Sequence, residues 1–183
     1  VTDLMQGPVY GLETPQTITN KELLPNFHYD DIFGTVVNRF IAQAVAGIPL
    51  TVFGKGGQTR GYLNIKDTLK CIELASLNPP ENGELIIYNQ FTEQFSVNQI
   101  AEKIQNAARQ VGINVQIESI PNPRVEMEEH YYNAKHTGLL ELGLEPTLMT
   151  EDVLGSMIEI VKQYQGSISV EKALPRVKWN KEK

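Results

Sequence analysis

The sequence predicts an α/β protein, and three observations support this fold class. Short apolar segments such as "LIIY" at 85–88 have the length and composition of buried strands. They alternate with longer segments whose apolar residues recur every three to four positions, as in amphipathic helices. Turn residues such as "NPPENG" separate the segments. A chain of 183 residues is long enough to bury one core, so we expect a single region covering 1–183.

In the first half of the chain we expect strands, a long loop and two helices. Residues 1–5 form the end of a buried strand, and 7–30 form a long irregular loop, a feature that is usually functional. A helix covers 31–46, because its apolar residues follow helical spacing and Gly47 supplies a stop. Strands follow at 49–53 and 62–65. Asp67 then caps a helix that runs to about 77.

In the second half, one helix is specified more strongly than the other elements. Ser96 and Gln99 form a capping box in front of it, and Gly112 closes it after 111. Strands are expected on either side of this helix, at 85–88 and 115–120. Two further helices are expected at about 135–142 and 151–164, the second with Thr150 as its cap.

The composition excludes several classes of protein. The net charge of −6 comes without a block of basic residues, so we expect no nucleic-acid partner. No apolar run approaches the roughly 20 residues of a membrane-spanning helix, so we expect no membrane span. Cys71 lies in an apolar helical pattern and is the one cysteine, so we expect a core residue and no disulfide. The start at Val1, without an initiator methionine, favours a fragment.

The stretch "FGKGGQTRGY" at 53–62 is the first candidate site. Its glycines, beginning with Gly54, permit a tight bend close to a ligand, and Arg60 can hold two phosphate oxygens at once. The alternative is a glycine hairpin with an exposed arginine, since the spacing matches neither a Walker loop nor a dinucleotide fingerprint. The strand backbone before the bend can pair with the polar edge of a nucleobase, at Thr51, Val52 and Phe53.

A second candidate site lies in "IPNPRVEMEEHYYNAKH" at 120–136. Two prolines stiffen the chain beside Arg124, which can hold phosphate, and one of Glu126, Glu128 and Glu129 can accept hydrogen bonds from a ribose. The alternative is a solvated charged loop. His130 and His136 match no zinc signature, so we expect no metal. Gln6 is a further candidate, because it follows a predicted strand at the end where open α/β sheets bind ligands.

Four segments together resemble the C-terminal half of the UDP-sulfoquinovose synthases. They are "TDLMQGPVYG", "FGKGGQTRGYLNIKDT", "YNQFTEQFSVNQIA" and "NPRVEMEEHYYNAKHTGLLELGLEP", and the resemblance covers nearly the whole chain. These synthases are extended short-chain dehydrogenase/reductases of the NAD-dependent epimerase/dehydratase superfamily. The resemblance implies the substrate-binding portion of an extended Rossmann-type fold without the N-terminal NAD-binding half. Strands at 1–6 and 84–90 would then belong to the NAD-domain sheet, and 7–30 would be a substrate-side loop.

The resemblance also implies an activity and a set of site residues. The family converts UDP-glucose and sulfite into UDP-sulfoquinovose for sulfolipid biosynthesis, with the help of a tightly held NAD. By resemblance, the backbone at 51–53 meets the uracil, Arg60 and Arg124 hold the diphosphate, and Glu126 meets the ribose. Gln6 contacts the sugar-phosphate region, and Tyr10 helps to cover the sugar of UDP-glucose or a related UDP-sugar.

The chain departs from the family pattern in its catalytic parts. We find neither the glycine-rich turn that seats NAD nor a credible Tyr-x-x-x-Lys pair, because Tyr131 and Lys135 match that pattern in the wrong segment. We therefore expect no catalytic or cofactor-binding residue here, no NAD bound to the chain alone, and no turnover by it. Unpaired strands would favour self-association, pairing with a separate NAD-binding chain, or rebuilding of the sheet within the fragment.

Several interpretations remain open. The chain is half of a UDP-sulfoquinovose synthase, or half of another nucleotide-sugar epimerase or dehydratase. Alternatively, it is a stand-alone UDP-sugar-binding module, or a truncated assembly protein without turnover. The expected location is the cytoplasm, or the chloroplast stroma for a plant protein.

Overall fold

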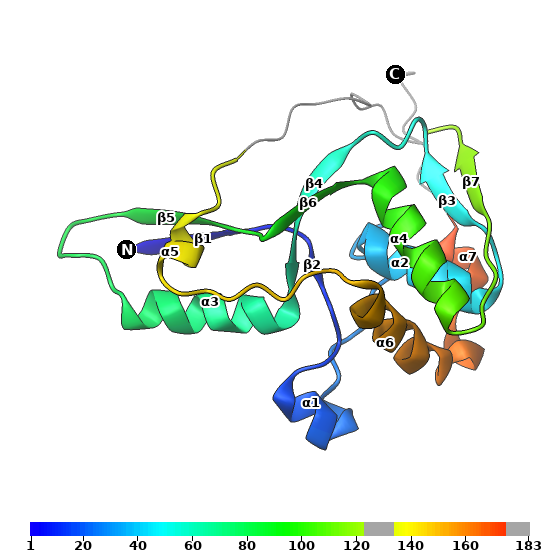
Figure 1. The fold of residues 1–183 in the computed structure, drawn as a ribbon, viewed down its shortest axis with the longest axis horizontal. Coiled ribbons are helices and arrows are strands. Elements are labelled where there is room, and N and C mark those ends of the chain that lie inside the picture. The colour runs from blue at the N-terminus through cyan, green and yellow to red at the C-terminus, as the bar shows by residue number, and fades with distance from the viewer. Residues whose placement is uncertain (123–133, 175–183) are drawn as a thin grey trace. The chain divides into compact units, whose positions relative to one another are not determined.

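The structure is a computed structural model that describes residues 1–122 and 134–174. Strands and helices are interspersed along the described chain and several strand pairs are parallel, which confirms the predicted α/β class (Figure 1). Contacts divide the chain into two compact units. The first comprises Val1–Leu24, Arg60–Gln94 and Tyr131–Met149, and the second comprises Pro25–Thr59, Phe95–His130 and Thr150–Lys183.

The described strands of the first unit form two small sheets. Strand β1 (Thr2–Gln6) pairs in parallel with β5 (Ile86–Gln90), and Gln6 lies opposite Gln90. The other sheet has the strand order β2 (Val9–Tyr10), β4 (Thr59–Asn64) and β6 (Glu93–Ser96), with β2 parallel to β4. The expectation of an irregular segment at 7–30 was wrong in detail, because it contains β2, α1 (Pro15–Thr19) and η1 (Lys21–Leu23).

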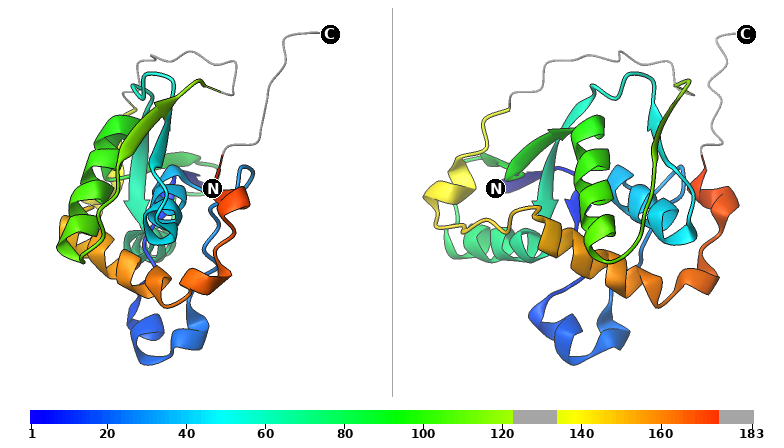
Figure 2. Two further views of the ribbon diagram at one scale, coloured as in Figure 1. Left: turned by 90° about the vertical axis from the view of Figure 1, so that its right-hand side faces the viewer. Right: turned by 45° about the vertical axis from the view of Figure 1, so that its right-hand side comes forward.

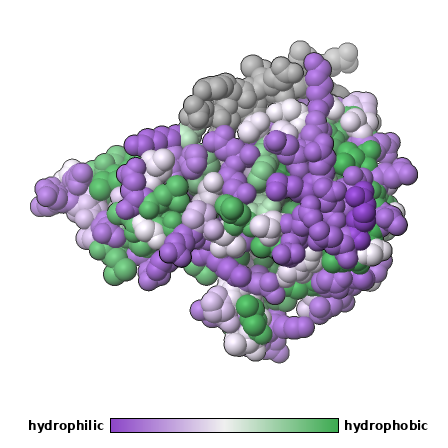
Figure 3. Space-filling view, viewed as in Figure 1, coloured by the Kyte–Doolittle hydropathy of each residue, from purple (hydrophilic) through white to green (hydrophobic). Residues whose placement is uncertain are grey.

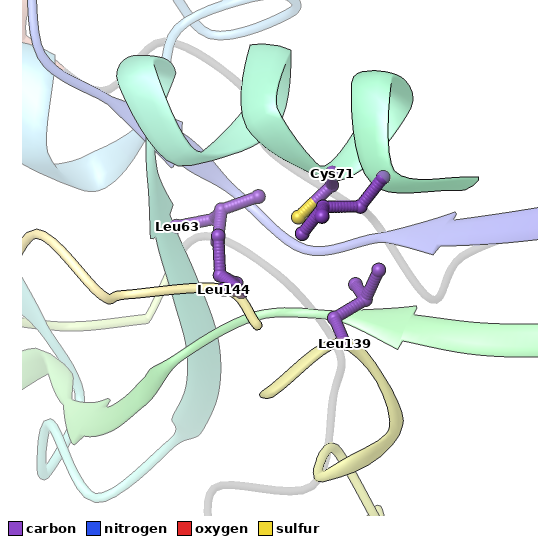
Figure 4. Packing of buried hydrophobic residues seen from close by; sticks show 5 residues of the cluster. Leu63, Cys71, Leu139 and Leu144 are labelled. Carbon is purple, nitrogen blue, oxygen red and sulfur yellow. The ribbon is translucent and has the colours of Figure 1, made fainter. Parts of the chain in front are cut away.

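Helix α3 (Ile65–Leu77) covers the core of the first unit. Its Cys71 and Leu74 pack beside Leu63 of β4 and beside Leu139 and Leu144, which come from the segment around α5 (Gly138–Glu141) (Figure 4). Cys71 is fully buried, so its predicted role as a core residue is confirmed. Burial raises the pKa of the Cys71 thiol, which keeps the thiol protonated inside the cluster.

Among the described residues, one face of the β1–β5 pair is largely exposed to solvent. Leu4 and Tyr88 pack against the core cluster, whereas Met5 and Ile87 point to the opposite face, because side chains alternate along a strand. Met5 is 54% exposed and Ile87 is 56% exposed. Figure 3 shows apolar patches among polar ones on the part of the surface that β5 and α3 occupy in Figure 1. Two strands with an open apolar face are marginal by themselves.

In its described part, the second unit combines three longer helices with one strand pair. Strand β3 (Leu50–Phe53) pairs in parallel with β7 (Ile117–Ile120). Helices α2 (Val36–Ala46), α4 (Val97–Gln110) and α6 (Glu151–Lys162) pack against one another, and the short α7 (Val170–Ala173) contacts α2 after η2 (Gln165–Ser167) (Figure 2). Their buried residues include Phe40, Ile100, Ile104, Leu154 and Ile158.

Helix ends agree with the sequence where a local cap decides them. The capping box of Ser96 and Gln99 is present at α4, and Thr150 caps α6 through the N–H of Val153. Helix α5 is shorter than predicted and begins at Gly138. Helix α3 begins at Ile65 with Asn64 as its N-cap, so the prediction that Asp67 caps it was wrong.

No helix among residues 1–122 and 134–174 is both long and apolar enough to cross a membrane.

Candidate functional site

The outward edge of β3 is the first part of the candidate site. The Leu50 N–H donates to Gln116 at 2.8 Å, and the Gly54 N–H donates to Ile120 at 2.9 Å. Because successive residues of a strand point their backbone groups in opposite directions, Leu50, Val52 and Gly54 face β7. The backbone groups of Thr51 and Phe53 therefore point away from β7, where the sequence predicted contact with a nucleobase.

Helix α2 meets this edge at Thr51. The Gln43 amide donates to Thr51 Oγ1 at 2.7 Å, and Gln43 Oε1 accepts from the Thr51 N–H at 3.0 Å. Arg39 Nη2 donates to the Thr51 carbonyl at 3.1 Å. These hydrogen bonds engage the N–H, the hydroxyl oxygen and the carbonyl of Thr51. The carbonyl oxygen has two lone pairs, so it can accept a second donor besides Arg39. Sequence reasoning missed both Arg39 and Gln43.

Phe53 ends the strand and begins the glycine bend. Its carbonyl accepts from the Gly56 N–H at 3.3 Å, and Gly54 takes a φ of 59°, a left-handed conformation that favours glycine. The Arg39 guanidinium lies 4.2 Å from the centroid of the Phe53 ring, within the range of a cation–π contact. The strand edge and the ring are thus both held by one arginine of α2.

The glycine bend is fixed to the first turn of α4. Asn98 donates through its backbone to Gly56 at 3.1 Å and through its side chain to Lys55 at 2.8 Å. A Cβ on Gly56 would lie 2.1 Å from Asn98 Oδ1, so this glycine is required by packing within the protein. The Val97 N–H donates to Gln58, and Ser96 accepts from the Gln99 N–H. The first N–H groups of α4 are therefore already used, and they do not form a seat for a phosphate.

Arg60 lies near the start of β4 and is exposed. Its charge acts on Tyr62, two residues further along the same strand. Burial raises the pKa of Tyr62 to about 12, and the positive charge of Arg60 partly opposes this rise. An exposed guanidinium that follows the bend is suited to an anion, as the sequence predicted.

Gln6 and Tyr10 occupy different surroundings in the first unit. Gln6 is exposed at the carboxyl end of β1. Tyr10 is only 1% exposed, and its hydroxyl donates to the Thr147 carbonyl at 2.9 Å and lies 3.4 Å from Glu93 Oε2. Burial, followed by the Glu93 charge, raises the pKa of Tyr10. A direct contact between Tyr10 and a sugar would require this network to open.

The network around Tyr10 also holds the chain before α6. Glu93 Oε2 accepts from the Met149 N–H at 2.6 Å, and Asp67 Oδ2 accepts from the Thr147 N–H at 2.8 Å. Asp67 is 2% exposed, and its burial raises its pKa. Two carboxylates thus fix the 147–149 segment, a role that the sequence did not reveal because the partners lie far apart in the chain.

Several candidate residues lie outside the part of the chain that the structure describes. They are Arg124, Glu126, His130 and Tyr131, so the predicted second phosphate contact and ribose contact remain predictions. Among residues 1–122 and 134–174, no cluster of three or more histidine, cysteine or acidic side chains could hold a metal ion. His136 instead packs against Phe91, with ring centroids 4.5 Å apart.

The chain is similar in sequence to two curated UDP-sulfoquinovose synthases. The chain is 52% identical to the chloroplastic UDP-sulfoquinovose synthase of Spinacia oleracea over 180 residues, which cover 98% of this chain and 37% of the relative. It is 44% identical to the UDP-sulfoquinovose synthase of Sulfolobus acidocaldarius over 183 residues, which cover 99% of this chain and 46% of the relative. The chain thus spans less than half the length of these relatives. No protein-family model matches it.

The fold has solved counterparts. The structure of UDP-glucose 4-epimerase from Thermus thermophilus, a complex with NAD, superposes with a TM-score of 0.61 at 20% identity. The superposition covers 86% of this chain and 45% of the epimerase. At this identity the likeness concerns the fold alone, which agrees with the predicted extended Rossmann-type class. The sequence resemblance is confirmed in its own right: over nearly all of its length, the chain is homologous to part of the UDP-sulfoquinovose synthases.

Proposed function

We propose that this chain is the UDP-sugar-binding part of a UDP-sulfoquinovose synthase. The observation that carries the proposal is the identity of 52% and 44% to two such synthases over nearly the whole chain. The outward edge of β3 supports it, because this edge ends in a fixed glycine bend followed by an exposed arginine. The substrates in this proposal are UDP-glucose and sulfite, which such a synthase combines into UDP-sulfoquinovose with release of water.

The nucleobase in our proposal pairs with the edge of β3. The Thr51 carbonyl is an acceptor and the Phe53 N–H is a donor, and both point away from β7. Uracil presents the matching pair, an N3–H donor beside the O4 acceptor. Val52 and Gly54 contribute backbone to the same strand and bend.

The diphosphate in our proposal is held by Arg60 together with Arg124. Arginine suits this task because its charge is permanent and its planar fork donates two parallel hydrogen bonds to phosphate oxygens. Glu126 remains our candidate for the ribose hydroxyls, and Gln6 for the sugar-phosphate region. Tyr10 contributes by fixing the chain beside Thr147, and it contacts the sugar only if its hydroxyl network opens.

NAD and the catalytic tyrosine have no place in the described residues under this proposal. The first N–H groups of α4 donate hydrogen bonds to Gln58, Gly56 and Ser96. The first turn of α4 therefore does not fit a dinucleotide pyrophosphate. At the start of α3, the Lys66 N–H donates to Asn64. We propose that an NAD-binding region outside this sequence supplies the cofactor, in the same or a separate chain, and that it covers the open face with Met5 and Ile87.

We further propose that the protein works in the cytoplasm, or in the chloroplast stroma if its source is a plant, since the spinach relative is named as chloroplastic.

Calorimetric titration with UDP-glucose tests the binding part of the proposal. The wild-type chain should bind, and Arg60→Ala should weaken binding by about 1.5–3 kcal/mol, because a hydrogen bond between charged groups is lost. Arg109→Ala is the matched control, since Arg109 is an exposed arginine on α4. Equal affinity of the wild type and Arg60→Ala would remove Arg60 from the site, and absence of binding by the folded wild type would refute the binding function.

Complementation tests the enzymatic part. The chain should gain synthase activity with UDP-glucose and sulfite when it is co-expressed with the NAD-binding half of a relative. Binding of UDP-glucose without any gain of activity would favour the second candidate, a UDP-sugar-binding module without turnover. The exposed side chain of Arg60, which follows the glycine bend in sequence, is the observation that favours that candidate.

A further inference from the structure

Two polar side chains on one face of α2 determine the shape of the β3 edge. Arg39 and Gln43 are four residues apart in the helix, so they project from the same face. Gln43 holds the N–H and the hydroxyl of Thr51, and Arg39 holds the Thr51 carbonyl. This edge of the strand is therefore organised by a helix and not by a neighbouring strand, and Thr51 is only 5% exposed.

Arg39 makes a second contact on the same edge. Its guanidinium lies 4.2 Å from the Phe53 ring centroid and 5.2 Å from that of Phe40. A guanidinium stacks on an aromatic face and donates in its own plane at the same time, which an ammonium group cannot do. One side chain therefore fixes both the direction of the Thr51 carbonyl and the position of the Phe53 side chain.

We propose that Arg39 is a positioning residue for nucleobase recognition, which makes the edge of β3 selective for uracil. The inference rests on the proposed function, because it assumes that the base lies at this edge. It assigns to Arg39 no contact with the phosphates. Gln43 holds the N–H and the hydroxyl of Thr51 in place, and Arg39 sets the direction of the Thr51 carbonyl.

The hydrogen-bonding pattern of the edge explains the selectivity. The Thr51 carbonyl accepts from the N3–H of uracil while the Phe53 N–H donates to its O4. Cytosine offers an acceptor at N3 and a donor at its amino group, so both positions would clash electrostatically with this edge. Loss of Arg39 lets the carbonyl turn and the Phe53 ring move, and the discrimination between the two bases falls.

Titrations of the full 183-residue chain with UDP, CDP and inorganic pyrophosphate test this inference. In Arg39→Gln, UDP affinity should fall about tenfold, the loss expected for a hydrogen bond from a charged group, while pyrophosphate affinity stays within about twofold. The preference for UDP over CDP should fall by a similar factor. Arg39→Lys should retain part of the preference, since an ammonium group replaces one of the two contacts. Arg109→Gln should leave all three affinities unchanged.

The outcomes separate this inference from the proposed function. If the wild type binds neither UDP nor pyrophosphate, the proposed function is overturned and the inference with it. Wild-type binding of UDP, combined with an unchanged UDP-to-CDP preference in folded Arg39→Gln, would overturn the inference alone. An equal loss of UDP and pyrophosphate affinity would also overturn it, because that pattern indicates a general structural role. Thermal unfolding of each variant establishes that it is folded.

Discussion

Asp67 offers a sharp test of how the first unit is held together. Its carboxylate is 2% exposed and accepts from the Thr147 N–H at 2.8 Å across 80 positions of sequence. Asp67→Ala leaves that N–H without its acceptor, which costs about 1–3 kcal/mol of the free energy of unfolding. This loss is a large share of the roughly 5–15 kcal/mol that stabilises a typical domain.

Asp67→Asn separates the hydrogen bond from the charge. An asparagine oxygen still accepts from Thr147, so this variant should lie within about 1 kcal/mol of the wild type at neutral pH. Burial raises the pKa of Asp67 above its ordinary value of 3.8, so the folded protein holds the proton more tightly than the unfolded chain. The stability that this raised pKa contributes is therefore fully present below the unfolded pKa and is lost as pH rises through the folded pKa. Stability of the wild type relative to Asp67→Asn should increase on acidification.

Urea unfolding followed by circular dichroism measures these differences. Asp152→Ala is the matched control, because Asp152 also lies in the first turn of a helix but is exposed. It should change the free energy of unfolding by less than about 1 kcal/mol. A variant Asp67→Ala as stable as the wild type would refute the role of the Thr147 contact. A wild-type advantage over Asp67→Asn that grows with rising pH would refute the sign of the pKa argument.

Three further predictions address packing and reactivity. Gly61→Ala should lower the free energy of unfolding by about 1–3 kcal/mol in urea titrations, because its Cβ would lie 2.5 Å from Phe91, whereas Gly166→Ala, with open space around it, should change little. Ser96→Ala should cost about 1 kcal/mol in the same assay, since the N-cap of α4 is lost, and an unchanged midpoint would contradict the cap. Iodoacetamide should label Cys71 at least about tenfold more slowly in the native than in the unfolded chain, and equal rates measured by mass spectrometry would contradict its burial.

The sequence predicts helix ends well where the cap is local and poorly where competing local bonds decide them. The expected start of α2 near Asp31 was wrong, and the helix begins at Val36. The Asp30 carboxylate accepts from the N–H groups of Ile32 and Phe33 at 2.8 and 3.0 Å, which forms a turn in place of the first helical turn. These backbone bonds also lower the pKa of Asp30. The apolar spacing of Ile32 and Phe33 misled the prediction, because both are exposed.

At α3 the N-cap is Asn64 and not the predicted Asp67, and a tertiary contact of Asp67 accounts for the difference. Asn64 and Asp67 both favour a helix N-terminus, but Asp67 is engaged by Thr147 from a distant segment. The candidate site shows the same limit. The glycine bend and Arg60 are visible in sequence, whereas the roles of Arg39 and Gln43 depend on how α2 lies against β3. Two polar residues at i and i+4 within an apolar helix were the available signal.

The central claim is that the edge of β3 and the following bend bind a uridine nucleotide. An NMR titration of the ¹⁵N-labelled chain with UDP tests it most directly, because it reports on each amide separately. We expect saturable shifts concentrated at the amides of Thr51, Phe53 and Gly54 and at the Arg60 side chain, and weaker shifts in Arg60→Ala. Saturation by UDP without shifts at these positions, or with shifts confined to another part of the chain, would contradict the claim.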